Sequence, residues 1–90
     1  MSNPKLAAKS LILASGPENP GAAEVIRSVL RQFVFEELEL QRIDLGGRTI
    51  VAILIAHDRA HTTAINRDLD GLLKSERLDV ALLEIEDASP

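Results

Sequence analysis

Two short, unbroken apolar runs constrain the fold of this 90-residue chain more than any other feature. They cover residues 11–14 and 50–56, and each precedes a segment whose apolar residues recur every three or four positions. An apolar run of this length is typical of a strand covered on both faces, and the periodicity after it is typical of a helix that packs by one side. The sequence therefore predicts two units, each a strand followed by a helix.

Two further strands complete a predicted βαββαβ order. The predicted strands cover residues 10–15, 36–44, 48–57 and 78–86, and the predicted helices cover residues 20–34 and 59–74. Gly46 and Gly47 supply the positive φ angles that a tight connection needs, so the second and third strands are expected to form a hairpin. Gly71 lies inside the second helix and costs it about 1 kcal/mol relative to alanine, which makes this the weaker helix.

The same patterns predict the topology. The first and third strands are central, because the second and fourth interleave charged or small residues. With right-handed crossovers, this gives a ferredoxin-like α/β sandwich: an antiparallel four-stranded sheet of order 4-1-3-2 with both helices on one face. Since residues 50–56 supply apolar side chains to both faces, we expect an apolar patch that is covered by a second subunit, in a homo-dimer, or by an adjacent domain.

Composition excludes several classes of function. A formal net charge of -4 disfavours nucleic acid, and Phe33 and Phe35 are the only aromatic residues available for stacking on bases. The chain has no cysteine for a disulfide or a thiolate metal site. No apolar run is long enough to span a membrane, and residues 1–9 contain no signal peptide, so a cytoplasmic location is expected. We expect one domain, residues 10–87, between flexible ends at 1–9 and 88–90.

The segment between the first strand and the first helix is the best candidate for a binding site. Pro20 suits the first position of a helix, and Asn19 before it can cap an unpaired amide. Gly21 leaves no Cβ over the first turn, so an anion could approach the N–H groups there. Glu18 brings an acid to the same loop. The expected ligand is therefore a free amino acid, which carries both a carboxylate and an ammonium. An ordinary strand-to-helix turn without a ligand is the alternative.

This loop also carries a family resemblance. A βαββαβ unit with a Gly-x-[Asp/Glu]-x-Pro-Gly loop after its first strand resembles the ACT domain family of small-molecule-binding regulatory modules. The motif positions are Gly16, Glu18, Pro20 and Gly21. The likeness is closest to the N-terminal ACT domain of actinobacterial-type phosphoserine phosphatases, because residues 34–43 and 78–82 are similar to the second and fourth strands of that subfamily. It covers about residues 10–87.

The resemblance implies amino-acid binding, often of serine, at a domain or subunit interface beside the loop, with adjacent domains paired into a wider sheet. Glu18 stands where aspartate is usual, and Ala22 stands where a larger aliphatic residue is usual. The implied function is a non-catalytic regulatory domain of serine biosynthesis. The alternative is an interaction domain that pairs subunits or packs on a catalytic domain without a ligand. The candidate ligand-binding residues are Gly16, Glu18, Asn19, Pro20, Gly21 and Ala22.

No catalytic residue, metal site or cofactor is expected. Asp68 and Asp70 look like the nucleophile loop of haloacid dehalogenase phosphatases, but residues two apart in a helix project about 200° apart and cannot share a magnesium ion. His57 and His61 are four positions apart, but His57 is better placed at the end of the third strand, and no third ligand lies nearby. No serine, histidine and aspartate pattern supplies a nucleophile with a base.

The remaining acidic residues are expected to be solvated. They lie in residues 36–39 and 84–87, on the edge strands, where charge discourages edge-to-edge aggregation. Arg42 and Arg48 are available to pair with them.

Overall fold

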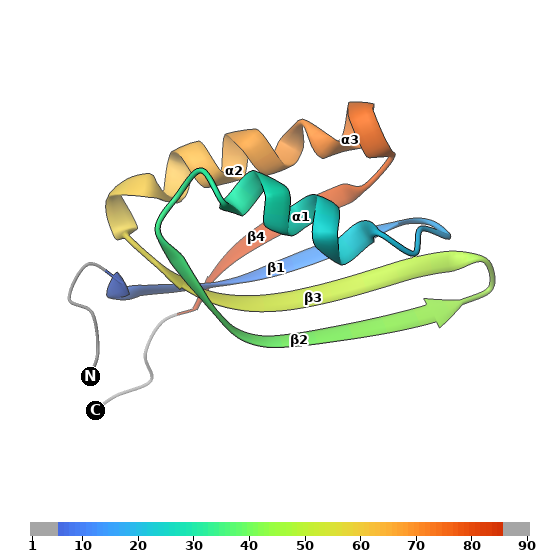
Figure 1. The fold of residues 1–90 in the computed structure, drawn as a ribbon, viewed down its shortest axis with the longest axis horizontal. Helices are drawn as coiled ribbons and strands as arrows, with labels where there is room; N and C mark the ends of the chain where they lie inside the picture. Colours follow the sequence, from blue (N-terminus) through green and yellow to red (C-terminus); the bar gives the residue numbers. More distant parts are fainter. Residues whose placement is uncertain (1–5, 86–90) are drawn as a thin grey trace.

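The computed structural model describes residues 6–85, which form a layer of helices over a sheet (Figure 1). The strands are β1 (Ala8–Pro17), β2 (Phe35–Leu45), β3 (Arg48–His57) and β4 (Asp79–Ile85). The helical segments are α1 (Ala22–Leu30) after β1, and then η2 (Arg59–His61), α2 (Thr62–Asp70) and α3 (Leu72–Glu76) after β3. This is the predicted βαββαβ order, with the second helix divided.

The sheet has the order β2-β3-β1-β4, and every neighbouring pair is antiparallel. This is the predicted order 4-1-3-2 read from the other edge, so the ferredoxin-like fold with β1 and β3 at its centre is confirmed. In Figure 1 the helices lie above the same face of the sheet. Gly46 and Gly47 have φ angles of 55° and 80°, so the hairpin turn between β2 and β3 uses the predicted glycines.

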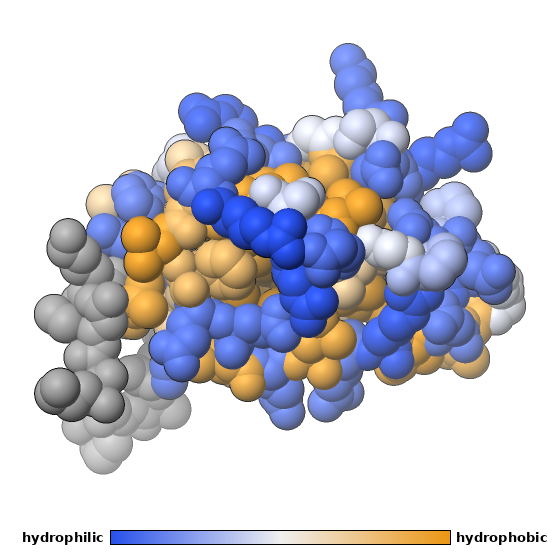
Figure 2. Space-filling model, viewed as in Figure 1, coloured by the Kyte–Doolittle hydropathy of each residue, from blue (hydrophilic) through white to orange (hydrophobic). Residues whose placement is uncertain are grey.

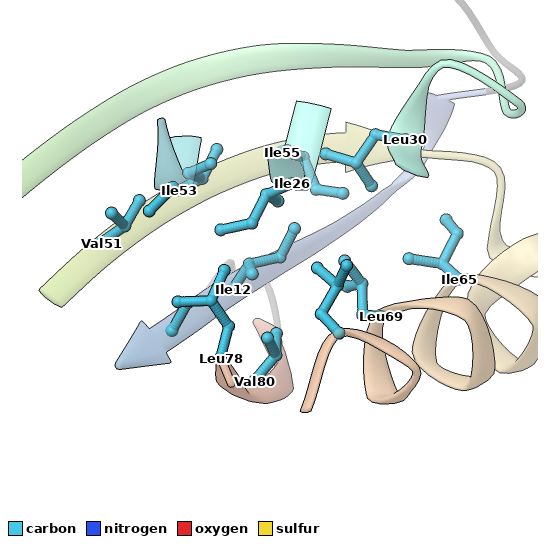
Figure 3. Close-up of a cluster of buried hydrophobic side chains, with 13 residues drawn as sticks. Ile12, Ile26, Leu30, Val51, Ile53, Ile55, Ile65, Leu69, Leu78 and Val80 are labelled. Carbon is cyan, nitrogen blue, oxygen red and sulfur yellow. The ribbon is translucent and has the colours of Figure 1, made fainter. Parts of the chain in front are cut away.

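The core lies between the helices and this face of the sheet (Figure 3). Successive side chains of a strand point to opposite faces, so every second residue of β1 and β3 enters the core. Each large apolar side chain buried there contributes about 1.5 to 3 kcal/mol relative to exposure. The fully buried ones include Ile12, Ile26, Leu30, Ile53, Ile55, Ile65 and Leu69.

Helix α1 is shorter than the predicted helix over residues 20–34. It begins at Ala22 rather than at Pro20, with Gly21 as its N-cap residue. The carbonyls of Asn19 and Pro20 accept hydrogen bonds at 2.9 and 3.0 Å from the guanidinium of Arg42 in β2, and the helix begins after them. At its other end the helix gives way to a tighter turn of 3₁₀ type.

The second helix was predicted as one segment over residues 59–74, and it breaks at Gly71. This is the position at which glycine lowers helix propensity. Ile65, Leu69 and Leu72 are buried as expected, whereas Leu73 is 57% exposed. Leu73 follows Leu72 by about 100° around the helix axis, which turns it away from the sheet.

Strands β1 and β2 are slightly longer than predicted, β3 has the predicted bounds, and β4 begins one residue later than predicted. β1 covers residues 8–17 rather than 10–15, so Gly16 and Pro17 are part of the strand. The predicted flexible ends lie outside the described residues, apart from residues 6–9, of which Ala8 and Lys9 belong to β1.

The face of the sheet opposite the helices carries an apolar patch of the expected kind. Five large apolar side chains on this face are 38 to 64% exposed, and we call the surface that they form the open face. The open face consists of Leu13, Ile43, Leu45, Leu83 and Ile85. Figure 2 shows hydrophobic atoms along the lower margin of the molecule, below the strands, between hydrophilic ones. Among residues 6–85, no helix has the length and apolarity that crossing a membrane requires.

Candidate functional site

The loop of residues 18–21 lies beside the tip of the β2–β3 hairpin (Figure 1). The amide of Glu18 donates to the carbonyl of Gly47 at 2.8 Å. The amide of Asn19 donates to Oγ1 of Thr49, a fully buried residue of β3, at 2.9 Å. Two consecutive loop amides are therefore bonded to the hairpin.

Arg42 of β2 holds the same loop from its carbonyl side. Its Nη1 donates to Pro20 O at 3.0 Å, and its Nη2 donates to Asn19 O at 2.9 Å. Asp44 accepts from Nε and Nη2 of Arg42 at 3.1 and 3.2 Å. The hydrogen bonds from Arg42 and Thr49 lower the pKa of the Asp44 carboxyl below its ordinary value of 3.8. Asp44 is therefore ionised at neutral pH and keeps the guanidinium in place.

These contacts surround an open pocket of about 220 Å³, which is lined by Glu18, Pro20, Arg42 and Asp44. Glu18 is exposed, and within residues 6–85 its carboxylate has no hydrogen-bond or ion-pair partner. The charge of Arg42 is already matched by Asp44. The unmatched charge of the pocket is thus negative and belongs to Glu18, which favours a positively charged group beside it.

The amides at the start of α1 are partly occupied by the loop itself. The amide of Gly21 donates to Oδ1 of Asn19 at 2.9 Å, and the amide of Ala22 donates to Asn19 O at 3.3 Å. Asn19 is not the N-cap residue, because that position belongs to Gly21 and no side chain caps the helix. Asn19 instead accepts from the amides of Gly21 and Ala22, which lie among the N–H groups that an anion was expected to use. An anion at this loop therefore depends on donors from elsewhere, and Arg42 is the nearest cation.

The other predicted site residues have different places. Asn19 and Gly21 form the loop that frames the pocket. Gly16 lies in β1, where an added Cβ would come within 2.7 Å of the carbonyl oxygen of Arg77. The side chain of Ala22 is fully buried in the core. The structure thus gives Gly16 and Ala22 packing roles, whatever the loop binds.

Sequence analysis missed Arg42 and Asp44 as pocket residues. The expected pairing of Arg42 and Arg48 with the acidic residues in 36–39 and 84–87 is wrong: Arg42 pairs with Asp44, and Arg48 bonds to a serine of β1. Glu37 instead forms an ion pair with Arg27 of α1, with Nε and Oε1 2.8 Å apart. The sequence did contain a signal for these two pocket residues. Side chains of a strand alternate between its faces, and counting back from the hairpin turn places Arg42 and Asp44 on the helix side of β2, level with the loop.

A buried serine–histidine pair lies toward the other end of the sheet. Oγ of Ser10 is 2.8 Å from Nε2 of His57, and both residues are 0% exposed. Nδ1 of His57 is 3.0 Å from the carbonyl oxygen of Asp58, which only accepts. In the neutral ring Nδ1 therefore carries the proton and Ser10 donates to Nε2. The pair resembles a nucleophile with its base, which sequence analysis did not expect, but it has no access to solvent, and we assign it a structural role.

The other acidic and histidine residues that sequence analysis considered have structural positions in α2 and β3. Asp68 and Asp70 lie in α2, as predicted, and His57 ends β3. In the described part of the chain, no group of three or more His, Cys, Asp or Glu residues is placed to hold a metal ion.

No protein-family model and no curated protein sequence matches this chain. Solved structures do match it. An ACT domain protein from Streptococcus pneumoniae superposes with a TM-score of 0.76 at 10% sequence identity, over 87% of this chain and 90% of that chain. The regulatory subunit of aspartate kinase from Thermus thermophilus gives 0.65 at 17% identity, over 83% and 50%. A candidate glycine cleavage system transcriptional repressor gives 0.79 at 16% identity, over 92% and 48%.

These likenesses show that the chain has the fold of ACT domains. They also show a difference in size, because the chain spans about half the length of the aspartate kinase regulatory subunit and of the candidate repressor. At such low identity the fold is the shared property, so the function rests on the chemistry of the pocket.

Proposed function

We propose that this chain is a non-catalytic regulatory module that binds a small amino acid between the 18–21 loop and the hairpin tip. One observation carries the proposal: on an ACT fold, the guanidinium of Arg42 and the carboxylate of Glu18, which has no partner within residues 6–85, line the same pocket. A free amino acid carries an ammonium that matches the charge of Glu18 and a carboxylate that can accept a hydrogen bond from Arg42. Its ammonium would pair with Glu18, and its carboxylate would meet the donors on the other side of the pocket.

Serine is our first choice of ligand. This choice comes from the resemblance of the loop motif to the ACT domain of phosphoserine phosphatases. In a longer protein of the cytoplasm, the module would regulate an enzyme of serine biosynthesis. The chain itself contributes no catalytic step in this proposal, since the Ser10–His57 pair is buried and has no access to solvent.

Thermal unfolding with a panel of amino acids tests the proposal. Ligand at about 100 times its dissociation constant stabilises the fold by about 2.7 kcal/mol. For a domain of this size that is a rise in Tm of roughly 10 °C or more. The chain has no Trp and no Tyr, so far-ultraviolet circular dichroism is the appropriate signal. If no amino acid raises Tm, the proposed function is wrong.

Two variants locate the ligand. Glu18→Gln removes the charge that would pair with the ammonium, and Gly21→Leu places a bulky group over the start of α1. An added Cβ at Gly21 meets nothing nearer than Oδ1 of Asn19 at 3.7 Å, so we expect folding to survive. The Tm rise should be lost in both variants. A wild-type response in both would place the ligand elsewhere.

The open face favours a second candidate function, subunit pairing without a ligand. Five large apolar side chains on one surface are typical of a surface that another protein covers. The two functions are compatible, because the pocket lies on the helix side of the sheet and the open face lies on the other.

A further inference from the structure

The hydrogen-bonding capacity of Arg42 is not exhausted by the protein. A guanidinium has five N–H donors: one on Nε and two on each terminal nitrogen. Nε donates to Asp44, and Nη1 donates once, to Pro20 O. Nη2 donates to Asn19 O, to Asp44 and, at 3.4 Å, to Oγ1 of Thr49. Within residues 6–85, one N–H of Nη1 therefore has no acceptor. Arg42 lines the pocket, so this donor is available to a ligand.

The guanidinium is also fixed in direction. Its side chain is only 27% exposed. Oγ1 of Thr49 donates to Oδ1 of Asp44 at 2.9 Å and accepts from the amide of Asn19 at 2.9 Å. Hydrogen bonds join four residues in a closed ring, which we call the Arg42 ring. The bonded pairs are Arg42 and Asp44, Asp44 and Thr49, Thr49 and Asn19, and Asn19 and Arg42. A donor that is already oriented binds with a smaller loss of conformational entropy than a mobile side chain.

Only arginine suits this position. The planar fork of the guanidinium reaches two loop carbonyls and Asp44 together, whereas the single ammonium of lysine has three donors at one point. A carboxylate that meets the remaining N–H would accept a charge-assisted hydrogen bond.

We propose that Arg42 determines the specificity of the pocket for a ligand with a free α-carboxylate, and that the Arg42 ring holds the 18–21 loop in its binding shape. This inference rests on the proposed function and adds to it the residue that selects the acid end of the ligand. Glu18 selects the ammonium end, so the pocket distinguishes free amino acids from both amines and simple acids.

The ligand arm of the test compares L-serine with L-serinamide, which keeps the ammonium and hydroxyl but lacks the carboxylate. Calorimetric titration of the wild-type chain should show serine binding at least about tenfold more tightly, the value of one charge-assisted hydrogen bond at a partly exposed site. Arg42→Met should remove this preference. Arg42→Lys should not restore it fully, because it lacks the fork. Arg48→Met is the matched control: Arg48 lies on the same hairpin and, within residues 6–85, its side chain bonds only to Ser15, so its removal should leave the preference unchanged.

The second arm needs no ligand. Hydrogen exchange of the Asn19 and Gly21 amides reports the order of the loop, and exchange of core amides such as that of Ile53 reports global stability. Arg42→Met should speed exchange of the two loop amides by about tenfold, through loss of its bonds to the loop carbonyls, with little change at Ile53.

The outcomes separate this inference from the proposed function. If wild type binds serine and Arg42→Met keeps the same preference over serinamide, Arg42 is not the specificity residue, although the proposed function survives. Unchanged loop exchange in Arg42→Met overturns the role of the Arg42 ring. If wild type binds neither compound, the proposed function and the carboxylate role of Arg42 both fail, and the exchange arm still decides whether Arg42 orders the loop.

Discussion

Substitution by alanine should lower the stability of the fold at Gly16, the first glycine of the loop motif, and leave it nearly unchanged at Gly21, the second. At Gly16, an added Cβ would lie 2.7 Å from the carbonyl oxygen of Arg77 and 3.1 Å from Cδ2 of Leu78. The backbone contact cannot be relieved by rotating a side chain, so β1 or the segment before β4 must shift. Overpacking of this kind costs about 1 to 3 kcal/mol. A loss of about 2 kcal/mol lowers Tm by roughly 10 °C in a domain of this size.

Gly21→Ala is the matched control. The backbone at Gly21 has φ -98° and ψ 13°, which alanine adopts, and the new Cβ has open space around it. Thermal and urea unfolding, followed by far-ultraviolet circular dichroism, should show a stability within about 1 kcal/mol of wild type. If Gly16→Ala is as stable as Gly21→Ala, the close approach to Arg77 does not explain the first glycine of the motif. Gly16 would then regain its place among the candidate ligand residues.

Three further predictions concern the core, the surface charges and the open face. Ser10→Ala leaves Nε2 of His57 buried without a donor and should lower the free energy of unfolding by about 1 to 3 kcal/mol. In a His57→Leu background the same substitution should cost much less. If the losses of the two substitutions are additive, the Ser10–His57 hydrogen bond does not stabilise the fold. Acid should destabilise the fold below about pH 4.5, because three carboxyls have lower pKa values in the folded state than in the unfolded state. The stabilisation from these carboxyls is complete above the unfolded-state pKa and is lost as pH falls through the folded-state pKa. A free energy of unfolding that stays constant in urea titrations from pH 3 to 6 would contradict this prediction. These carboxyls are Glu24, Glu37 and Asp44, bonded first to Arg31, Arg27 and Arg42 respectively. Leu83→Lys should weaken self-association through the open face, as measured by light scattering, and a wild-type chain that is monomeric at high concentration would leave an adjacent domain as the cover.

The fold was predictable because its signals are local. Strand β3 has the predicted bounds, residues 48–57, and the hairpin turn uses the predicted glycines. The start of the first helix failed because it depends on contacts between distant residues. Pro20 favours a helix start in isolation, but Arg42 binds the carbonyls before Gly21 and delays the helix. Such a competition cannot be seen in the local sequence.

The candidate site was predictable only in part for the same reason. The 18–21 loop and Glu18 stood out because Gly, Pro and Asn have strong local conformational preferences. The partners of the loop are 22 to 30 positions away in the chain and come from ordinary strand sequence. Arg42, Asp44 and Thr49 have no local peculiarity. The bonds of Arg42 and Thr49 to Asn19, and of Asp44 to both of them, can be seen only once the hairpin is placed beside the loop.

A single titration tests the central claim most directly: amide and arginine Nε chemical shifts of the ¹⁵N-labelled chain, recorded while L-serine is added. We predict saturable shifts confined to Glu18, Asn19, Gly21 and the Nε of Arg42, with the open-face residue Leu83 unaffected. Glycine and L-alanine, added in the same way, rank the side-chain preference. An absence of shifts at the 18–21 loop with all three amino acids would contradict the claim that this pocket binds a small amino acid.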